Sequence, residues 1–475
     1  MGQTWRWMGA AVAAGLVGTA QANNVSIANV ALVNVTNGTA EIQFDVSWEH
    51  SWRYDEMVAG GTVTNHDAVW VFAKYRAGGE WRPVLLADTG HLAAAGTILT
   101  PASNGSGAQV GAFVLRDGDG HGALTATGVR LRWDYVRGGL TGTNGVDISV
   151  HGIEMVYIPE GPFYLGSGGP DTDTFYEYPE PALPYQVASE DAIEVGATTG
   201  SLYYAAVKSG GDRGGPIPAD FPKGYQAFYC MKYEITQGQY AHFLNRLPAG
   251  VDGARFPNAY GANRNTLWLS NGVYVADAPD RACNYLDWAD VTTYLDWAGL
   301  RPMTELEYEK ACRGPLYPIP GEYAWGDTTY TAVTSLSGTD GSGSETASPA
   351  TANCHIFRCS GLTGPVRAGL FATASSTRHE AGAGYYGVME LTGNLYERAV
   401  SAGVSAARSF RPVHGDGDVS TPVPEWGAGS IGGLRGGSHA CNPVGVHPVS
   451  SRYYAAYCPT GRDAYMGGRG VRSAP

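Results

Sequence analysis

Basic residues are scarce in this chain of 475 residues. Lys and Arg together number 31 against 44 Asp and Glu, which gives a formal net charge of −13 at pH 7. Nucleic-acid-binding proteins meet the phosphate backbone with a basic stripe, and no such stripe occurs here. The composition therefore argues against nucleic acid as a partner.

Long apolar runs are missing beyond the first residues. No later segment approaches the ~20 apolar residues that a membrane-spanning helix needs. At the start, Arg6 precedes a short apolar run from Met8 to Val17, and Ala20 and Ala22 are small residues suited to cleavage. Residues 1–22 thus predict a signal peptide cleaved near Ala22, with an uncleaved anchor as the alternative. We expect a protein that is secreted or on the cell surface, with no transmembrane segment in the mature chain.

Cysteine is also rare, with seven in the chain. In an exported protein we expect these residues to form disulfides or buried thiols, and an odd number leaves at least one unpaired within one chain. Cys354 and Cys359 are close enough for a small local loop, but spacing does not determine the pairing. Together with His355 they resemble half of a zinc site whose second half is missing.

Glycine is abundant, at 67 residues, and 44% of the chain is hydrophobic, which is typical of a compact protein rich in loops. Residues 23–150 show the alternation of apolar and polar residues typical of half-buried strands, separated by Gly- and Asn-containing turns. This region predicts an all-β sandwich, in which we find no catalytic constellation. The apolar positions of its clearest strands are Ile42, Phe44, Val46 and Trp48, then Val129, Leu131, Trp133 and Tyr135.

Residues 151–475 predict a second domain with short helices and long irregular stretches. Residues 167–220, rich in Gly, Pro, Asp and Glu, are expected to form a long surface insertion. Capping boxes mark the start of two helices, and a third is expected over residues 287–298, ending at Gly299. The capping residues are Thr236 with Gln239, and Thr304 with Glu307.

The last eighty or so residues contain glycines and arginines in a pattern that no regular secondary structure requires. Tight turns are expected at Gly393, Gly436 and Gly437, because glycine alone adopts positive φ at little cost. Arg435 and Arg452, like Arg472, are expected to tie these loops together through bonds to carbonyls and carboxylates. The pieces are residues 387–397, 434–438, 451–452 and 468–472.

Together with earlier segments, these pieces resemble the formylglycine-generating enzyme (sulfatase-modifying factor) family over residues 151–475. The earlier segments are residues 155–166, 233–240, 301–309 and 323–327. The resemblance implies an α+β fold related to C-type lectins and rich in irregular loops. It says less about activity, because one fold hosts many functions.

The family's chemistry needs two cysteines after the Arg-Gly-Gly-Ser motif. Formylglycine-generating enzymes oxidise a substrate cysteine with copper held by two thiolates, the soft ligands that Cu(I) prefers. Here Cys441 takes the first position, and the second is Val446. His439 and His447 lie nearby and are candidates for another metal site. The helical His-x-x-x-His-x-Glu pattern of the iron-dependent relatives is absent from the sequence. We therefore expect no copper and no catalytic residues.

The resemblance also implies structural calcium, held by backbone carbonyls and by Asn, Asp and Glu oxygens. The matching side chains are Asn394 and Glu397 in one segment and Asn353 in another. The alternative is that Glu397 pairs with a buried arginine such as Arg435.

Without a catalytic pair, the exposed loops become the expected functional surface. Aromatic side chains there are suited to anchoring another surface protein or a glycan, although several could instead fill the core. The candidates are His439, Tyr453, Tyr454, Tyr457 and Tyr465.

The sequence as a whole favours an exported, non-catalytic structural or binding protein that self-assembles as a filament or surface layer. One alternative is a ligand-binding display protein, because the chain's end at Gly470-Val-Arg472 resembles the variable region of proteins diversified by error-prone retroelements. A copper or iron oxidase of the sulfatase-modifying-factor type is the other.

Overall fold

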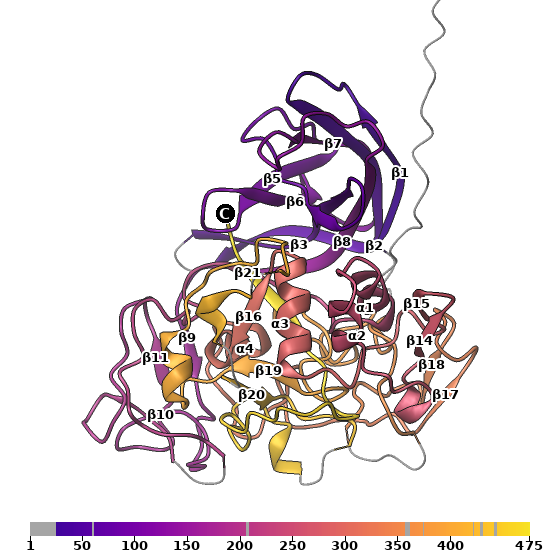
Figure 1. The fold of residues 1–475 in the computed structure, drawn as a ribbon. Helices are drawn as coiled ribbons and strands as arrows, with labels where there is room; N and C mark the ends of the chain where they lie inside the picture. The colour runs from indigo at the N-terminus through magenta and orange to yellow at the C-terminus, as the bar shows by residue number, and fades with distance from the viewer. Residues whose placement is uncertain are drawn as a thin grey trace, which may run out of the picture.

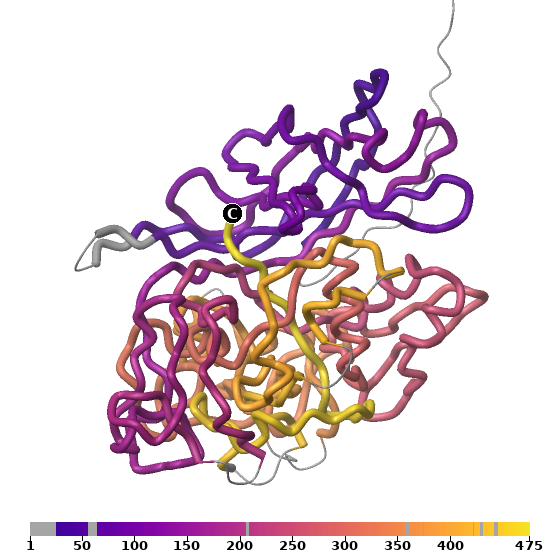
Figure 2. Tube along the Cα trace, turned by 60° about the vertical axis from the view of Figure 1, so that its left-hand side comes forward, coloured from indigo at the N-terminus to yellow at the C-terminus, as the bar shows by residue number. Residues whose placement is uncertain are grey.

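The computed structural model describes most of the chain beyond the N-terminus: residues 25–58, 61–205, 209–356, 362–373, 375–420, 422–427, 431–440 and 444–475. The predicted signal peptide lies outside these residues, as do Cys359 and Cys441. The chain forms a strand-rich N-terminal lobe and a larger C-terminal lobe, seen from two directions in Figures 1 and 2. It is rich in strands and has few helices, which agrees with the α+β class.

One sheet runs through both lobes and joins 13 strands of the described residues. Along its main path the order is β1-β2-β3-β8-β13-β21-β16-β19-β20. Off this path, β4 and β6 pair with β3, β7 pairs with β2, and β5 pairs with β6. The strands are β1 (Ser26–Val33), β2 (Thr39–Val58), β3 (Gly61–Arg76), β4 (Trp81–Pro83), β5 (Thr97–Ser103), β6 (Gln109–Arg116), β7 (Gly120–Asp134), β8 (Asp147–Ile158), β13 (Phe228–Met231), β16 (Arg301–Thr304), β19 (Glu397–Val400), β20 (Gly432–Arg435) and β21 (Gly470–Ser473).

The remaining strands form small two-stranded sheets on the C-terminal lobe. These pairs are β9 (Phe163–Leu165) with β11 (Tyr185–Val187), β10 (Tyr176–Glu177) with β12 (Leu202–Tyr203), β14 (Leu267–Ser270) with β15 (Val273–Ala276), and β17 (Ser335–Ser337) with β18 (Thr346–Ser348). In Figure 1, β9 and β11 lie at the left of this lobe, and β14 and β15 lie at its right.

The strands predicted for the N-terminal lobe are confirmed. β2 and β7 pair antiparallel, and the alternating apolar side chains of both strands face one core. The residues Ile42, Phe44, Val46, Trp48, Val129, Leu131 and Trp133 are all at most 1% exposed.

The central strand β3 serves two cores at once. Its odd-numbered residues Val69 and Val71 belong to the N-terminal core, whereas Trp70 and Phe72 belong to the core of the C-terminal lobe. This follows from the period of two in a strand, which sends successive side chains to opposite faces. β8 crosses the predicted boundary at residues 150 and 151 and pairs with β3 on one side and β13 on the other. The two lobes therefore share the part of the sheet formed by β3 and β8.

Polar contacts also join the two lobes. The indole N–H of Trp70 donates to the Ala298 carbonyl at 2.8 Å. The buried ammonium of Lys74 donates to the carbonyls of Trp297 at 2.6 Å and Gly417 at 2.8 Å. Each is a side chain of the N-terminal lobe that satisfies backbone groups of the C-terminal lobe. A rigid attachment of the lobes follows from these contacts.

The C-terminal lobe contains short helices that begin where their caps predict. The predicted capping boxes at Thr236 and Thr304 are both present, and Asp287 forms a third with Asp290. α3 ends at Trp297, shortly before Gly299. The helices are α1 (Gln237–Leu244), α2 (Val251–Arg255), α3 (Trp288–Trp297) and α4 (Glu305–Arg313). In the described part of the chain, every helix is too short or too polar to cross a membrane.

The segment 167–220 is only partly a solvated face. Glu180, Asp191 and Glu194 are exposed, as expected for a surface insertion. Phe175 and Tyr204, however, are buried in the core of the C-terminal lobe. The segment is therefore anchored by apolar side chains.

Candidate functional site

The Arg-Gly-Gly-Ser motif begins on β20, and its arginine is buried against α4. Arg435 donates to Glu305 at 2.8 Å, to Glu309 at 2.7 Å and to the Val449 carbonyl at 2.7 Å. Arg452 also donates to Glu305, with hydrogen bonds of 2.8 and 2.9 Å to its two carboxylate oxygens. Burial by itself would raise the pKa of Glu305, but the two arginines outweigh it and hold the pKa below its usual value. The predicted role of these arginines in tying loops together is confirmed.

The two glycines of the motif are needed for space as well as for φ. Gly436 and Gly437 have φ of 81° and 72°. A Cβ on Gly436 would lie 2.5 Å from the Leu391 carbonyl oxygen, and one on Gly437 would lie 2.3 Å from the His447 ring. The turn can therefore close only without side chains at these positions.

The second copper-ligand position of the family holds a buried hydrocarbon side chain. Val446 is 4% exposed and has no atom that could bind a metal. Cys441 lies outside the described residues, so its thiol is not placed. Across the residues that are placed, no group of three or more His, Cys, Asp or Glu side chains is arranged to hold a metal ion.

The two histidines near this position bond to backbone groups. The Nδ1 of His439 accepts from the Gly364 N–H and its Nε2 bonds to the Ala464 carbonyl, both at 3.2 Å. The Nε2 of His447 bonds to the Ser438 carbonyl at 3.2 Å. Both rings are buried. The prediction that His439 belongs to an exposed binding surface is therefore wrong, because the motif's turn draws its ring into the loop core.

The predicted calcium ligands are held by protein groups instead. Glu397 forms an ion pair with Arg469 at 2.5 Å, and both side chains are fully buried. The side-chain oxygen of Asn394 accepts from the Val366 N–H, and that of Asn353 accepts from the Thr331 N–H, each at 2.9 Å. A guanidinium thus supplies positive charge at the Oε1 of Glu397, while its Oε2 has no hydrogen-bond partner in the described part of the chain. The alternative of a buried arginine partner fits, with Arg469 in place of Arg435.

Two further buried carboxylates surround this ion pair, and nothing in the sequence pattern singles them out. Glu234 accepts from the Leu395 N–H at 2.9 Å, and Glu390 accepts from the Gly369 N–H at 2.8 Å. Burial raises the pKa of both groups, to about 7 for Glu390. Their only available signal in the sequence is an acidic residue inside an otherwise apolar segment.

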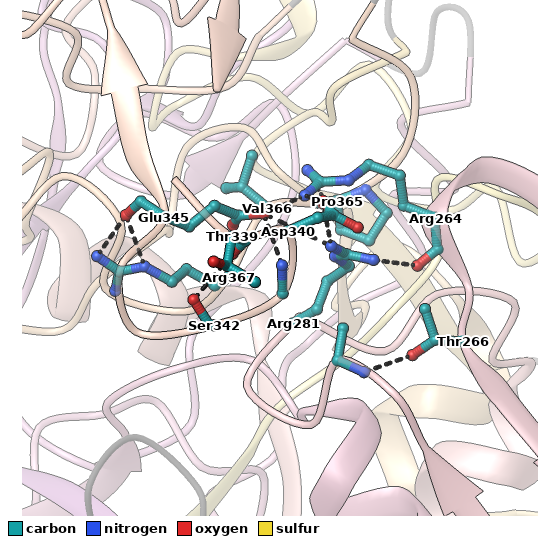
Figure 3. A network of polar contacts seen from close by, with 12 residues as sticks. Arg264, Thr266, Arg281, Thr339, Asp340, Ser342, Glu345, Pro365, Val366 and Arg367 are labelled. Atoms are coloured by element: carbon teal, nitrogen blue, oxygen red, sulfur yellow. Dashed lines mark hydrogen bonds and ion pairs between the residues drawn. The ribbon is translucent and has the colours of Figure 1, made fainter. Parts of the chain in front are cut away.

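A second charged cluster contains Asp340 and Glu345 together with Arg264, Arg281 and Arg367 (Figure 3). Asp340 accepts from Arg264 and Arg281 at 2.8 Å each, and Arg264 also bonds to the buried Glu345 at 2.5 Å. Burial would raise the pKa of Asp340, but the two arginines lower it to about 2. Arg367 donates to the Glu345 carbonyl. The cluster fastens loop 339–345 to three other segments and serves stability.

The tyrosines of the C-terminal loops divide into exposed and packed residues. Tyr457 is 47% exposed and Tyr453 is half-buried. Tyr454 and Tyr465 pack against a core cluster that contains Tyr396, as the alternative reading expects. Tyr453 and Tyr457 are thus the candidates that remain for a binding surface here.

The cysteines in the described residues give no support to a disulfide framework. Cys230, Cys283 and Cys312 are buried free thiols, and Cys458 is a half-buried one. Burial raises the pKa of Cys230 and of Cys312 to about 12, which makes these thiols unreactive.

Comparison with known proteins agrees with the motifs. The model of the sulfatase-modifying factor enzyme 1-like domain family matches residues 148–474. A formylglycine-generating enzyme of Thermomonospora curvata is 29% identical over 178 residues, which cover 36% of this chain and 52% of the relative. The match thus spans about half the length of that curated relative. The chain belongs to the sulfatase-modifying factor enzyme 1-like domain family.

Proposed function

We propose that this protein is a non-catalytic member of its family, an exported structural or binding protein that assembles with copies of itself. The observation that carries the first part is Val446, a buried hydrocarbon side chain where a copper site needs its second thiolate. The engagement of His439 and His447 by backbone carbonyls supports it, since neither imidazole replaces the missing ligand. In this reading the first lobe is a sandwich that presents a lectin-related second lobe.

Two groups of exposed apolar side chains support self-assembly. The hairpin of β14 and β15 exposes Trp268, Leu269 and Val273 by 38%, 51% and 51%. The loop at 316–319 exposes Tyr317 and its neighbours, and Tyr317 contacts Tyr164 of β9. In Figure 1 the hairpin and β9 lie on opposite sides of the C-terminal lobe. Two different patches on opposite sides suit a head-to-tail contact, which propagates into a filament.

Negative-stain microscopy of the exported protein tests the assembly. We expect filaments or sheets for the wild type and single particles for Leu269→Lys, which places a charge in the hairpin patch. Val136→Lys is the matched control, because Val136 is an equally exposed residue of the N-terminal lobe. Monodisperse particles for the wild type at all concentrations would contradict assembly.

Calcium is tested in the same experiment by adding a chelator. Because Arg469 already neutralises Glu397, we expect the assemblies and the melting temperature to survive chelation. Disassembly on chelation would instead support the calcium site that the family resemblance implies.

The oxidase alternative is tested by metal content and activity. We expect no stoichiometric copper after reconstitution with Cu(I), and no oxidation of a cysteine-containing substrate peptide. Copper binding at one equivalent together with peptide oxidation would establish an enzyme. The display alternative predicts an adenine-rich near-copy of the C-terminal segment in the source genome.

A further inference from the structure

A cleft of about 550 Å³ lies where the two lobes meet. One wall comes from β2, β3 and the start of β7, and the other from Lys232 and Tyr233 and from residues within 372–373 and 376–389 of the C-terminal lobe. Its volume lies within the range of roughly 300–1,000 Å³ typical of small-molecule sites. The cleft is separate from the Arg-Gly-Gly-Ser turn, because none of residues 435–440 or 444–446 lines it.

A bulge in β2 shapes the wall on the N-terminal side. The register of β2 against β7 shifts between Trp48 and Ser51, and His50 within the shift has a φ of 52°. Bulges bend a strand and turn side chains in new directions, often beside functional sites. Here the bulge is followed directly by Trp52, and both His50 and Trp52 line the cleft.

Three aromatic residues line the cleft. Trp52, Tyr233 and Tyr385 are each half-buried. The indole N–H of Trp52 donates to the Asn65 side chain at 2.9 Å, and the Lys232 ammonium lies 4.8 Å from its ring centroid. These contacts fix the orientation of the ring, and a fixed aromatic surface binds a ligand at low entropic cost.

The charge of the cleft is opposite to that of the chain. The protein carries a formal charge of −13, yet no carboxylate is among the described residues that line the cleft. Arg378 donates to the carbonyls of Cys312 and Ala324 at 2.8 and 2.7 Å, and no described carboxylate forms an ion pair with it. Lys232 is neutralised by Glu154 at 2.7 Å on its buried side. The guanidinium of Arg378 is therefore the cleft's available positive charge.

Carboxylates in a neighbouring hollow limit the region of the cleft that can accept an anionic group. A smaller hollow of about 180 Å³ shares His50, Tyr233 and Ala372 with the cleft and is lined by three carboxylates, Glu49, Glu154 and Asp280, and by one cation, Arg367. Its excess of carboxylates makes that side less favourable for an anion than the side of Arg378. We therefore expect a ligand to place its negative group toward Arg378.

Besides His50, Asn65 and His121, the polar groups that line the cleft include three hydroxyls on the rim. Thr373 and Thr377 are exposed, and Ser376 lies between them. Hydroxyls beside half-exposed rings match a sugar, whose ring presents C–H groups to an aromatic face and hydroxyls to its edges. Arg binds a planar carboxylate, or a sulfate, through paired donors.

We propose that this cleft binds an acidic saccharide, with sugar rings on Trp52 and Tyr385 and a carboxylate or sulfate group toward Arg378. The assignment does not depend on self-assembly or on the loss of oxidase chemistry, because neither involves these residues. It gives the chain a glycan partner at a site away from the C-terminal loops.

Calorimetric titration of the full mature chain tests the proposal with three probes. Tetragalacturonate presents carboxylates, a heparin-derived tetrasaccharide presents sulfates as well, and maltotetraose is the neutral control. We expect one acidic probe to bind at least about tenfold more tightly than maltotetraose, a difference of about 1.4 kcal/mol. The better of the two identifies the acidic group.

Two variants test whether the binding is in the cleft. Trp52→Ala should weaken binding of the acidic probe at least fivefold by removing the ring, in proportion to its share of the contact. Thr373→Glu adds a negative charge on the exposed rim without touching the core, and should weaken the acidic probe severalfold. Matched controls are Trp81→Ala, another half-buried tryptophan, and Thr351→Glu, another exposed threonine, both outside the cleft.

The outcomes separate the possibilities. Loss of binding in Trp52→Ala and Thr373→Glu, with both controls unchanged, supports the proposal. If maltotetraose binds as tightly as the acidic probes, the preference for an acidic saccharide is wrong. If the affinity for the acidic probe is unchanged in both cleft variants, the cleft is not the binding site. Absence of binding to either acidic probe at millimolar concentration overturns the proposal even if filaments form as expected.

Discussion

At the scale of single residues, the carboxyl group of Glu390 shows how burial makes the free energy of unfolding depend on pH. The side chain is buried, and within the described structure its Oε2 has no hydrogen-bond partner. Burial raises its pKa from 4.5 to about 7, although Arg469 opposes the shift. The folded protein thus holds a proton that the unfolded chain has released between these two values.

Replacing Glu390 with Gln should make stability less dependent on pH. The raised pKa in the folded state means that stability is fully present below about pH 4.5 and is lost as pH rises through about 7. The loss amounts to at most about 3 kcal/mol, from 1.36 kcal/mol per pKa unit. Urea denaturation at pH 5 and pH 8 measures it, with the exposed Glu380→Gln as control. Identical pH dependence in Glu390→Gln and wild type would contradict the interpretation.

Glu305 behaves in the opposite way, because Arg435 and Arg452 lower its pKa. We expect Glu305→Gln to cost about 3–5 kcal/mol at pH 7, since it leaves the buried guanidinium of Arg452 without its carboxylate and Arg435 with Glu309 alone. The pair of Asp220 and Arg411, both about 60% exposed, is the control, and Asp220→Asn should cost less than about 1 kcal/mol. In the wild type, the stabilisation that ionised Glu305 contributes is lost as pH falls through the lowered pKa of Glu305. Chemical denaturation gives both values, and equal costs would refute the buried network.

At the scale of elements, local sequence decides where the short helices begin. In the box that opens α1, the Thr236 hydroxyl accepts from the Gln239 N–H at 3.2 Å, and the Gln239 side chain accepts from the Thr236 N–H at 3.0 Å. Both contacts involve residues only three apart, so the pattern can be read without knowledge of the fold.

Thr236→Ala should therefore destabilise the protein by about 1 kcal/mol, because one N–H of the first turn loses its acceptor. Thr293→Ala on α3 is the control, because its hydroxyl bonds within the helix interior, and it should change stability by less than about 0.5 kcal/mol. Denaturant midpoints at constant slope measure both. A cost for Thr236→Ala no larger than the control's would argue against the cap.

At the scale of the whole molecule, the two lobes share β3 and β8 and should not unfold separately. Trp70 illustrates the coupling, because it belongs to the C-terminal core while its neighbours Val69 and Val71 belong to the N-terminal core. A strand that supplies both cores cannot leave one without exposing the other.

We expect one cooperative transition on heating, seen equally by tryptophan fluorescence and by far-UV circular dichroism. Trp70→Ala should lower the free energy of unfolding by about 3–5 kcal/mol and should leave a single transition, shifted to lower temperature. The exposed Trp268→Ala is the matched control. Two separate transitions in the wild type would show that the lobes are independent.

The sequence by itself determined the family, the strands of the N-terminal lobe and the helix starts. Through the family resemblance, it also led to the prediction that Val446 takes the second copper-ligand position. These features are local or follow a regular period: alternation over β2 and β7, a hydroxyl three residues from its N–H, or a motif of adjacent glycines.

Only the tertiary structure decided which charges meet. Glu397 pairs with Arg469 across 72 residues, and Arg435 meets Glu305 across 130. It also decided that His439 is buried, and that Trp52 shares a cleft with Arg378 from the other lobe. Such pairings depend on how loops without a repeating pattern fold over one another, and no period in the sequence encodes that. The physical reason is that burial and long-range contact, rather than residue type alone, set the partner of a charged side chain.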